Sequence, residues 1–353
     1  MKKILAFLLV FVNIFLLTSC NAGKKSVIEI NESVNIDTEI FSYFLNDVYY
    51  RYENKTELEY IDLATSECLG YIAINTQFSE SGNKLSPRDK ADISNETNAL
   101  WRIYGDYYEE IGVSKDTFFK INQFKKYKEI IRFSIYDTDG SDPINEEYIK
   151  EYFTTNNVGI KYFYQELYTP VTAEEYSAMS DYDKKIYDSA KKTAEERYTY
   201  ISEIANYVNS SVYTMDEAFM AVTGQVSADI SVSAAVVGKT GSSFSAEFMN
   251  AVFKQAIGSA FIITNADKSY VYFIERVDLL GDEYNFYEQY RNDCLEAVTE
   301  GLFVNKINEW IASYQAVRHM SAAQNCFSKI KRIDRSKYIG TEDYVFDGFN
   351  PLQ

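Results

Sequence analysis

The stretch from Ser227 to Asp278 constrains the fold of this chain more than any other. Its apolar residues alternate at first and then recur at helical spacing, and two short apolar runs follow, Ala260–Ile263 and Tyr270–Val277, which a polar loop joins. Alternation is typical of a half-buried strand, whereas helical spacing is typical of an amphipathic helix. The stretch therefore predicts a strand, a helix and two further strands, in that order.

The residues before this stretch extend the pattern. Val158–Tyr168 alternates like a strand. Two capping boxes follow, Thr172 with Glu175 and Thr214 with Glu217, in which the side chains of each pair bind free backbone N–H groups at a helix start. We therefore expect a long helix after the first box and a short helix after the second, before the strand, helix and strands already described.

Helical spacing dominates the chain on both sides of this segment. Between Asn35 and Tyr152 it predicts several helices, one of which begins at Ser86 and Pro87, a cap and a first-turn proline. After the segment, Glu283–Val317 has the pattern of one long helix. A chain of 353 residues is long for one compact core, so we expect two or more packed units.

Charge and histidine content exclude several function classes. The formal net charge of −17 argues against a nucleic-acid partner, because phosphate binding needs clustered Lys and Arg. His319, the single histidine, excludes Ser-His-Asp and Cys-His catalysis and multi-histidine zinc sites, and we expect it on the surface at a helix end. The sequence holds no phosphate loop or nucleotide fingerprint. We therefore expect no cofactor and no metal.

Aromatic residues are abundant, with 31 Tyr and 23 Phe. Exposed aromatic clefts suit a protein that binds unfolded chains. The same residues also fill the interiors of ordinary helical proteins. Composition leaves both interpretations open.

The first twenty residues have the pattern of a secretory leader. Lys2 and Lys3 precede an apolar run, Ile4–Leu17, that is too short to span a bilayer comfortably. The run ends in Leu17-Thr18-Ser19-Cys20, which resembles the bacterial lipobox. This resemblance implies that the chain is cut before Cys20, that the Cys20 thiol is lipidated, and that the protein is held on the extracytoplasmic face of a bacterial cell membrane.

The order of elements from Val158 to Val277 resembles that of a parvulin-type peptidyl-prolyl isomerase domain, and the whole chain resembles an extracytoplasmic foldase lipoprotein of the PrsA/SurA type. The resemblance implies an α+β fold. A mostly helical chaperone lobe, like the N-terminal domain of SurA, is completed by the C-terminal helix and carries an inserted parvulin-like α/β domain with a small antiparallel sheet.

The resemblance also implies domain bounds. These are residues 1–19 for the signal peptide, 20–26 for a tether, 27–154 for the helical chaperone domain, 155–281 for the parvulin-like domain, 282–318 for the returning helix, and 319–353 for a tail whose role stays open. The spacing of apolar residues shows which face of each helix is apolar but not what covers that face. The helical lobe could therefore be an open cradle for unfolded segments or a bundle with a closed core.

This chain departs from the family's pattern at the active site. The resemblance places the two family histidines at Tyr162 and Tyr272, and the residues of its proline pocket at Phe244, Phe248 and Phe253. Rotation about an X-Pro bond has a barrier of roughly 18–20 kcal/mol, and catalysis must stabilise the twisted amide. Two tyrosines do not reproduce paired imidazoles. We therefore expect weak or no isomerase activity and assign no catalytic residue.

The five aromatic positions nevertheless suit a peptide-binding surface. The leading interpretation is a membrane-anchored chaperone that binds unfolded or partly folded secreted proteins. One alternative is an active parvulin-type isomerase, and another is an envelope lipoprotein that scaffolds a folded partner. Phe244 and Phe248, at helical spacing, are also compatible with a closed core. The sequence leaves open the oligomeric state, the clients, and whether Cys68 and Cys294 form the disulfide that the family resemblance allows.

Overall fold

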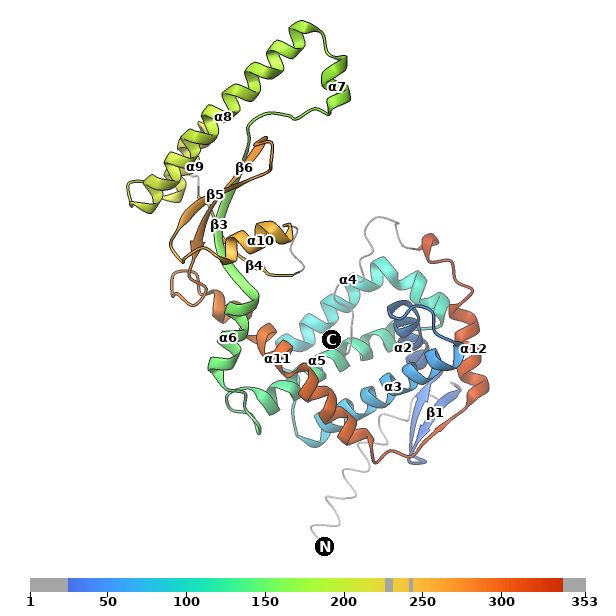
Figure 1. The fold of residues 1–353 in the computed structure, drawn as a ribbon. Coiled ribbons are helices and arrows are strands. Elements are labelled where there is room, and N and C mark those ends of the chain that lie inside the picture. Colours follow the sequence, from blue (N-terminus) through green and yellow to red (C-terminus); the bar gives the residue numbers. More distant parts are fainter. Residues whose placement is uncertain (1–24, 226–230, 241–243, 339–353) are drawn as a thin grey trace. The chain divides into compact units, whose positions relative to one another are not determined.

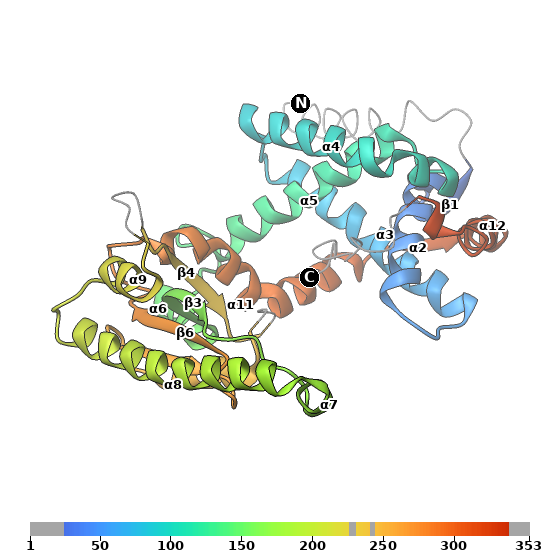
Figure 2. The same ribbon diagram turned by 90° about the horizontal axis from the view of Figure 1, so that it is seen from above.

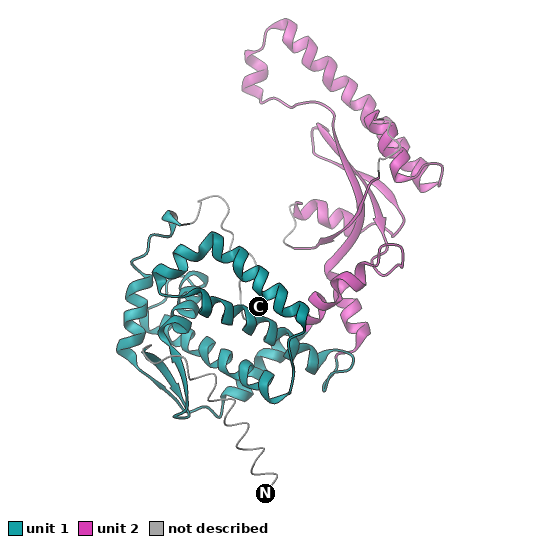
Figure 3. Ribbon diagram, turned by 180° about the vertical axis from the view of Figure 1, so that it is seen from behind, with its two compact units in different colours: residues 1–143, 299–353 teal, residues 144–298 magenta. Residues whose placement is uncertain are grey.

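The computed structural model describes residues 25–225, 231–240 and 244–338. The chain divides into two compact units (Figure 3). Unit 1 comprises Met1–Pro143 with Thr299–Gln353, and unit 2 comprises Ile144–Val298. Unit 2 is thus inserted in the sequence of unit 1.

Unit 1 is a helical bundle with a small antiparallel sheet (Figure 1). Its helices are α2 (Thr38–Arg51), α3 (Glu57–Glu80), α4 (Pro87–Ile111), α5 (Lys115–Tyr136), the C-terminal part of α11 (Phe286–Ile311) and α12 (Met320–Ile330), with the short η1 (Arg335–Lys337). Its strands, in the sheet order β2-β1-β7, are β1 (Ser26–Ile30), β2 (Val34–Asp37) and β7 (Ala316–Arg318).

Local sequence signals set several helix ends in unit 1. The Asp37 carboxylate accepts hydrogen bonds from two backbone N–H groups at the start of α2. Ser86 caps α4 in a capping box with Asp89, and Pro87 takes the first helical position. Gly112 ends α4 in the left-handed region, with φ of 88°. The predicted start of α4 is confirmed.

The core of unit 1 surrounds α2, whose Phe41, Phe44, Leu45 and Val48 are fully buried. Aromatic rings from other helices meet these side chains; the Phe44 ring lies 6.1 Å from that of Phe124 on α5. Most of the predicted apolar helix faces in this unit therefore pack on one another. The aromatic residues of unit 1 largely fill its interior.

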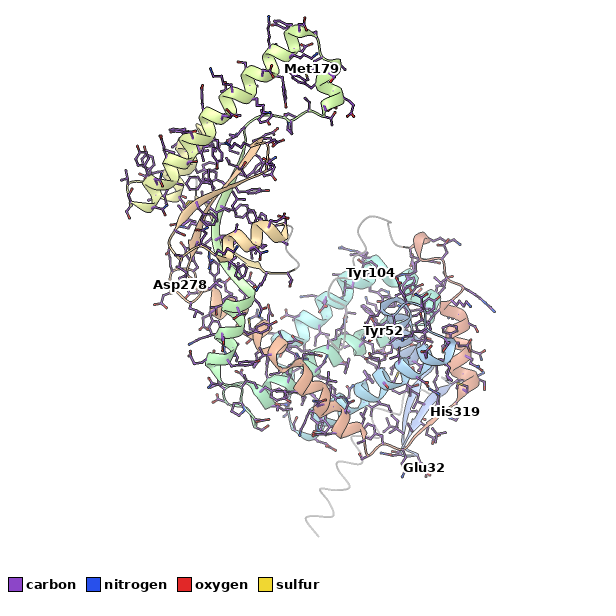
Figure 4. All side chains as sticks on the ribbon, in the orientation of Figure 1. Glu32, Tyr52, Tyr104, Met179, Asp278 and His319 are labelled. Atoms are coloured by element: carbon purple, nitrogen blue, oxygen red, sulfur yellow. The ribbon has the colours of Figure 1, made fainter. Side chains whose placement is uncertain are left out.

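The C-terminal region departs from the prediction of one long helix over Glu283–Val317. Helix α11 ends at Ile311, and Ala316–Arg318 forms β7, which pairs with β1. The prediction is wrong at this end because β7 satisfies backbone groups on the edge of β1, an interaction that helical periodicity cannot reveal. His319 begins α12 with an exposed side chain, as expected, and its N–H donates to the Val27 carbonyl (Figure 4).

Unit 2 combines a four-stranded antiparallel sheet with helices. The elements in chain order are α6 (Glu146–Asn156), β3 (Asn157–Glu166), α7 (Ala173–Ala178), α8 (Asp181–Asn209), α9 (Met215–Thr223), β4 (Ala234–Gly238), α10 (Ala246–Phe253), β5 (Ala260–Thr264), β6 (Tyr270–Val277) and the N-terminal part of α11. The strands lie in the order β4-β3-β6-β5. The predicted α+β class, with a small antiparallel sheet in the inserted segment, is confirmed.

Both predicted capping boxes of unit 2 are present, at Thr172 and at Thr214. The long helix expected after Thr172 is two helices, because the backbone at Met179 is extended and Ser180 caps α8 anew (Figure 4). The first strand predicted in the stretch Ser227–Asp278 is β4, and it begins at Ala234. Its expected residues up to 230 lie outside the described residues.

Helices cover the two faces of the sheet in unit 2 (Figures 1 and 2). Helices α8 and α9 pack on the face that carries Phe163, Val271 and Phe273. Helix α10 packs on the opposite face, against Val158 and Ile274. Because α10 has only two turns, it covers only part of its face.

The three described cysteines, Cys68, Cys294 and Cys326, are buried free thiols. The disulfide considered between Cys68 and Cys294 is therefore not formed in the structure.

Candidate functional site

The two tyrosines predicted at the family's histidine positions lie on the central strands of the unit 2 sheet. Tyr162 is on β3 and Tyr272 is on β6, and in the antiparallel register Tyr272 stands opposite Tyr164. Successive side chains of a strand point to opposite faces. Tyr162, Tyr164 and Tyr272 consequently share one face with Tyr270, the face on which α10 packs.

Helix α10 brings Phe248 to these tyrosines, and Phe244 is the residue just before the N-cap of that helix. Ser245 caps the helix by accepting a hydrogen bond from the Phe248 N–H at 3.1 Å, which fixes the chain where Phe244 enters. The rings of Phe244 and Phe248 are stacked with centroids 4.2 Å apart. Tyr162 meets Phe244 edge-on at 5.4 Å, and Tyr272 meets Phe248 edge-on at 5.1 Å. Such edge-to-face pairs are a favourable aromatic geometry.

Four of the five predicted substrate-binding residues therefore form one continuous cluster of rings. We call this cluster, with its two further tyrosines, the tyrosine face; it consists of Tyr162, Tyr164, Tyr270 and Tyr272 of the strands, Phe248 of α10, and Phe244, which precedes that helix.

The exposed fraction of the side chains increases from the base of the tyrosine face to its rim. Phe248, at its base, is 6% exposed, whereas Tyr270 is 36%, Tyr162 is 38% and Tyr164 is 61% exposed. The core interpretation thus holds for Phe248. The rim presents aromatic surface to solvent, anchored on a buried base.

Phe253 is separate from the other four predicted residues. It is the last residue of α10 and packs, partly buried, against the apolar cluster beneath the helix. The Lys239 ammonium lies 5.4 Å from its ring centroid. In the described part of the chain, no ring contact joins Phe253 to the tyrosine face. Phe253 therefore helps to hold α10 against the sheet.

Tyr164 and Tyr270 also belong to the tyrosine face but are not among the residues predicted from the sequence. The ring of Tyr164 lies 6.0 Å from that of Tyr272, and the ring of Tyr270 lies 5.5 Å from it. Each is two residues from a tyrosine that was singled out, so strand alternation alone places it on the same face. This two-residue spacing is the sequence signal from which both residues could have been predicted.

The tyrosine face offers aromatic rings and phenol groups but no imidazole, because the single histidine lies outside unit 2. Burial raises the pKa of the Tyr272 phenol above its ordinary value, so its hydroxyl keeps its proton at neutral pH. Among the described residues, no group of acidic, cysteine or histidine side chains is arranged to hold a metal ion. The surface is suited to apolar contacts and neutral hydrogen bonds.

Solved structures similar to this chain include foldase proteins of the PrsA type. The foldase protein PrsA from Streptococcus pneumoniae is 12% identical, with 74% of this chain and 87% of that chain covered and a TM-score of 0.36. For PrsA from Lactococcus lactis the identity is 14%, the coverage 87% and 99%, and the TM-score 0.36. PrsA from Bacillus subtilis is 16% identical, with 77% of this chain and 85% of that chain covered and a TM-score of 0.27.

No protein-family model and no curated protein matches the chain. Cys20, the predicted lipidation site, lies outside the described residues. Among the helices that the structure describes, none combines the length and the apolar character needed to cross a membrane.

Proposed function

We propose that this chain is an extracytoplasmic chaperone that binds unfolded or partly folded secreted polypeptides through the tyrosine face. The observation that carries the proposal is the ring cluster itself, whose base is buried and whose rim at Tyr162 and Tyr164 is exposed. Burial of apolar surface contributes about 25 cal/mol per Å². A non-native chain exposes apolar side chains that can cover such a rim, whereas a folded protein has few to offer.

Prolyl isomerase activity is weak or absent in this proposal. Tyr162 and Tyr272 contact Phe244 and supply phenols where the family has imidazoles. A phenol has one polar atom on its ring where an imidazole has two, so the pair does not reproduce the tuned hydrogen-bond network of two imidazoles. Marked acceleration of cis-trans exchange in a proline peptide, lost on Phe248→Ala, would favour the isomerase alternative.

The test of client binding uses the double variant Tyr162→Ala/Tyr164→Ala in the full chain. Both rings belong to the exposed rim, so the fold should be retained. Loss of about 1 kcal/mol of apolar contact is worth roughly a fivefold change in affinity, and two rings should together lower affinity for an unfolded client more than tenfold. The measurement is client aggregation and client affinity as functions of chaperone concentration.

Tyr200→Ala is the matched control. Tyr200 lies on α8 of the same unit and is more exposed than Tyr162, but it is not part of the tyrosine face. Equal losses in the control and the double variant would mean that general surface stickiness, and not this face, binds the client. Unchanged affinity in the double variant would contradict the proposal.

We also propose that the Cys20 thiol is lipidated and holds the protein at the cell membrane. The support is the leader pattern, Lys2 to Leu17, followed by the lipobox-like residues up to Cys20. Two or more acyl chains give stable attachment, because one chain binds only reversibly. Cys20→Ala should release the protein from the membrane fraction or leave the leader uncut. Unchanged fractionation and mass would refute the anchor.

A further inference from the structure

Within the described residues, one edge of β3 is unpaired beside the tyrosine face. Strand β4 pairs with β3 only over Asn157–Lys161, whereas β6 pairs with it over Gly159–Glu166. From Tyr162 onward, β3 therefore has a strand neighbour on one side only, within the residues that the structure describes.

The register shows which backbone groups face the open side. The Leu167 N–H donates to the Ser269 carbonyl at 2.7 Å, in register with the β3·β6 ladder, so the odd-numbered residues of β3 direct their N–H and C=O groups toward β6. The even-numbered residues direct theirs to the other side, as the bond from Lys239 N–H to the Asn156 carbonyl confirms. The N–H and C=O of Tyr164 thus face the open edge.

No hydrogen bond engages the backbone of Tyr164 on that side among the described residues. The next carbonyl along, that of Glu166, already accepts a bond from the Gln165 side chain at 2.7 Å. Tyr164 thus presents both a backbone donor and a backbone acceptor at this edge, and its ring is the most exposed of the tyrosine face. An unpaired strand edge of this kind is a template for another strand.

The opposite edge of the sheet, on β5, has a side chain bonded to its backbone. On β5 the Asn209 side-chain amide donates to the Ala260 carbonyl at 2.8 Å and accepts from the Ala260 N–H at 2.7 Å. This side chain makes both bonds that a neighbouring strand would make. The β5 edge is thus blocked at Ala260, whereas no described residue blocks the β3 edge at Tyr164 in this way.

We propose that an extended segment of the client polypeptide adds to the edge of β3 as a further strand, hydrogen-bonded to the backbone of Tyr164. The inference rests on the proposed function and specifies the conformation in which the client is bound. An extended peptide is the partner whose N–H and C=O groups match this edge. Its alternate side chains project onto the tyrosine face, so apolar residues at every second position are preferred.

The test uses the full chain and a synthetic peptide with Tyr or Val at even positions and Ser or Thr at odd positions. Two further versions carry backbone N-methyl groups, at the even positions in one and at the odd positions in the other. The alternation fixes which side chains meet the tyrosine face, so only one set of peptide N–H groups faces β3. We expect one N-methylated version to lose at least tenfold in affinity and the other to bind nearly as well as the parent.

Amide hydrogen exchange supplies the second readout. Binding of the parent peptide should slow exchange at the Tyr164 N–H, while the N–H of Ile262, on the opposite edge of the sheet, should be unchanged. Equal affinity losses for the two N-methylated peptides, with no protection at Tyr164, would overturn strand addition while leaving side-chain binding intact. If the parent peptide and unfolded clients fail to bind at all, the proposed function itself fails.

Discussion

The largest fully buried side chain in the described part of the protein is that of Arg132 on α5. Its guanidinium pairs with the Glu300 carboxylate of α11 and lies 4.9 Å from the ring centroid of Phe303. A buried charge costs several kcal/mol unless it is paired. The pair therefore fixes the C-terminal half of α11 against α5 within unit 1.

Glu300→Ala should destabilise unit 1 by about 2 to 4 kcal/mol, because it removes a carboxylate that pairs with the buried Arg132 guanidinium. The measurement is the free energy of unfolding in urea. Glu309→Ala, on the same helix, removes an exposed pair with Lys306 and should change stability little. Equal effects of the two variants would mean that burial of Arg132 does not depend on Glu300.

At the scale of elements, α12 shows how a short C-terminal helix completes a core. Its Ala323, Phe327 and Ile330 are buried, and the Phe327 ring lies 5.8 Å from Tyr49 of α2 and 5.9 Å from Tyr60 of α3. The helix thus contributes apolar contacts to α2 and α3. Residues after 318 were expected to form a tail of open role, but as far as Tyr338 they are part of unit 1.

Phe327→Ala should cost about 3 kcal/mol in the free energy of unfolding, the typical value for removing a buried phenyl ring. Met320→Ala, at the exposed start of the same helix, should stay within about 0.5 kcal/mol of the parent. A small effect of Phe327→Ala in thermal and chemical unfolding would show that α12 is not part of the cooperative core.

Local signals explain how much of the fold could be predicted. Capping boxes and first-turn proline act within one turn, so the starts of α4, α7 and α9 could be recognised from sequence. The pairing of β7 with β1 joins residues far apart in the chain and leaves no local pattern. The same limit applies to Tyr164, whose importance depends on where β4 stops pairing with β3.

At the scale of the whole molecule, the two units use their aromatic residues differently. In unit 1, rings such as Phe41 and Phe118 are buried in the core. In unit 2, the tyrosine face keeps exposed rings on a buried base. The four rings of Tyr162, Phe244, Phe248 and Tyr272 could be predicted as one group because the family resemblance placed them together. Their graded exposure could not, because it depends on the short length of α10.

Photo-crosslinking from single positions in the full chain can show whether the tyrosine face binds non-native polypeptide. Tyr164→p-benzoylphenylalanine places the photoreactive group on the face, and Tyr182→p-benzoylphenylalanine places it on α8 of the same unit, at a more exposed residue. If the tyrosine face binds the client, an unfolded secreted protein should crosslink from position 164 and not from position 182. Crosslinking that follows exposure alone, stronger from 182 than from 164, would contradict it.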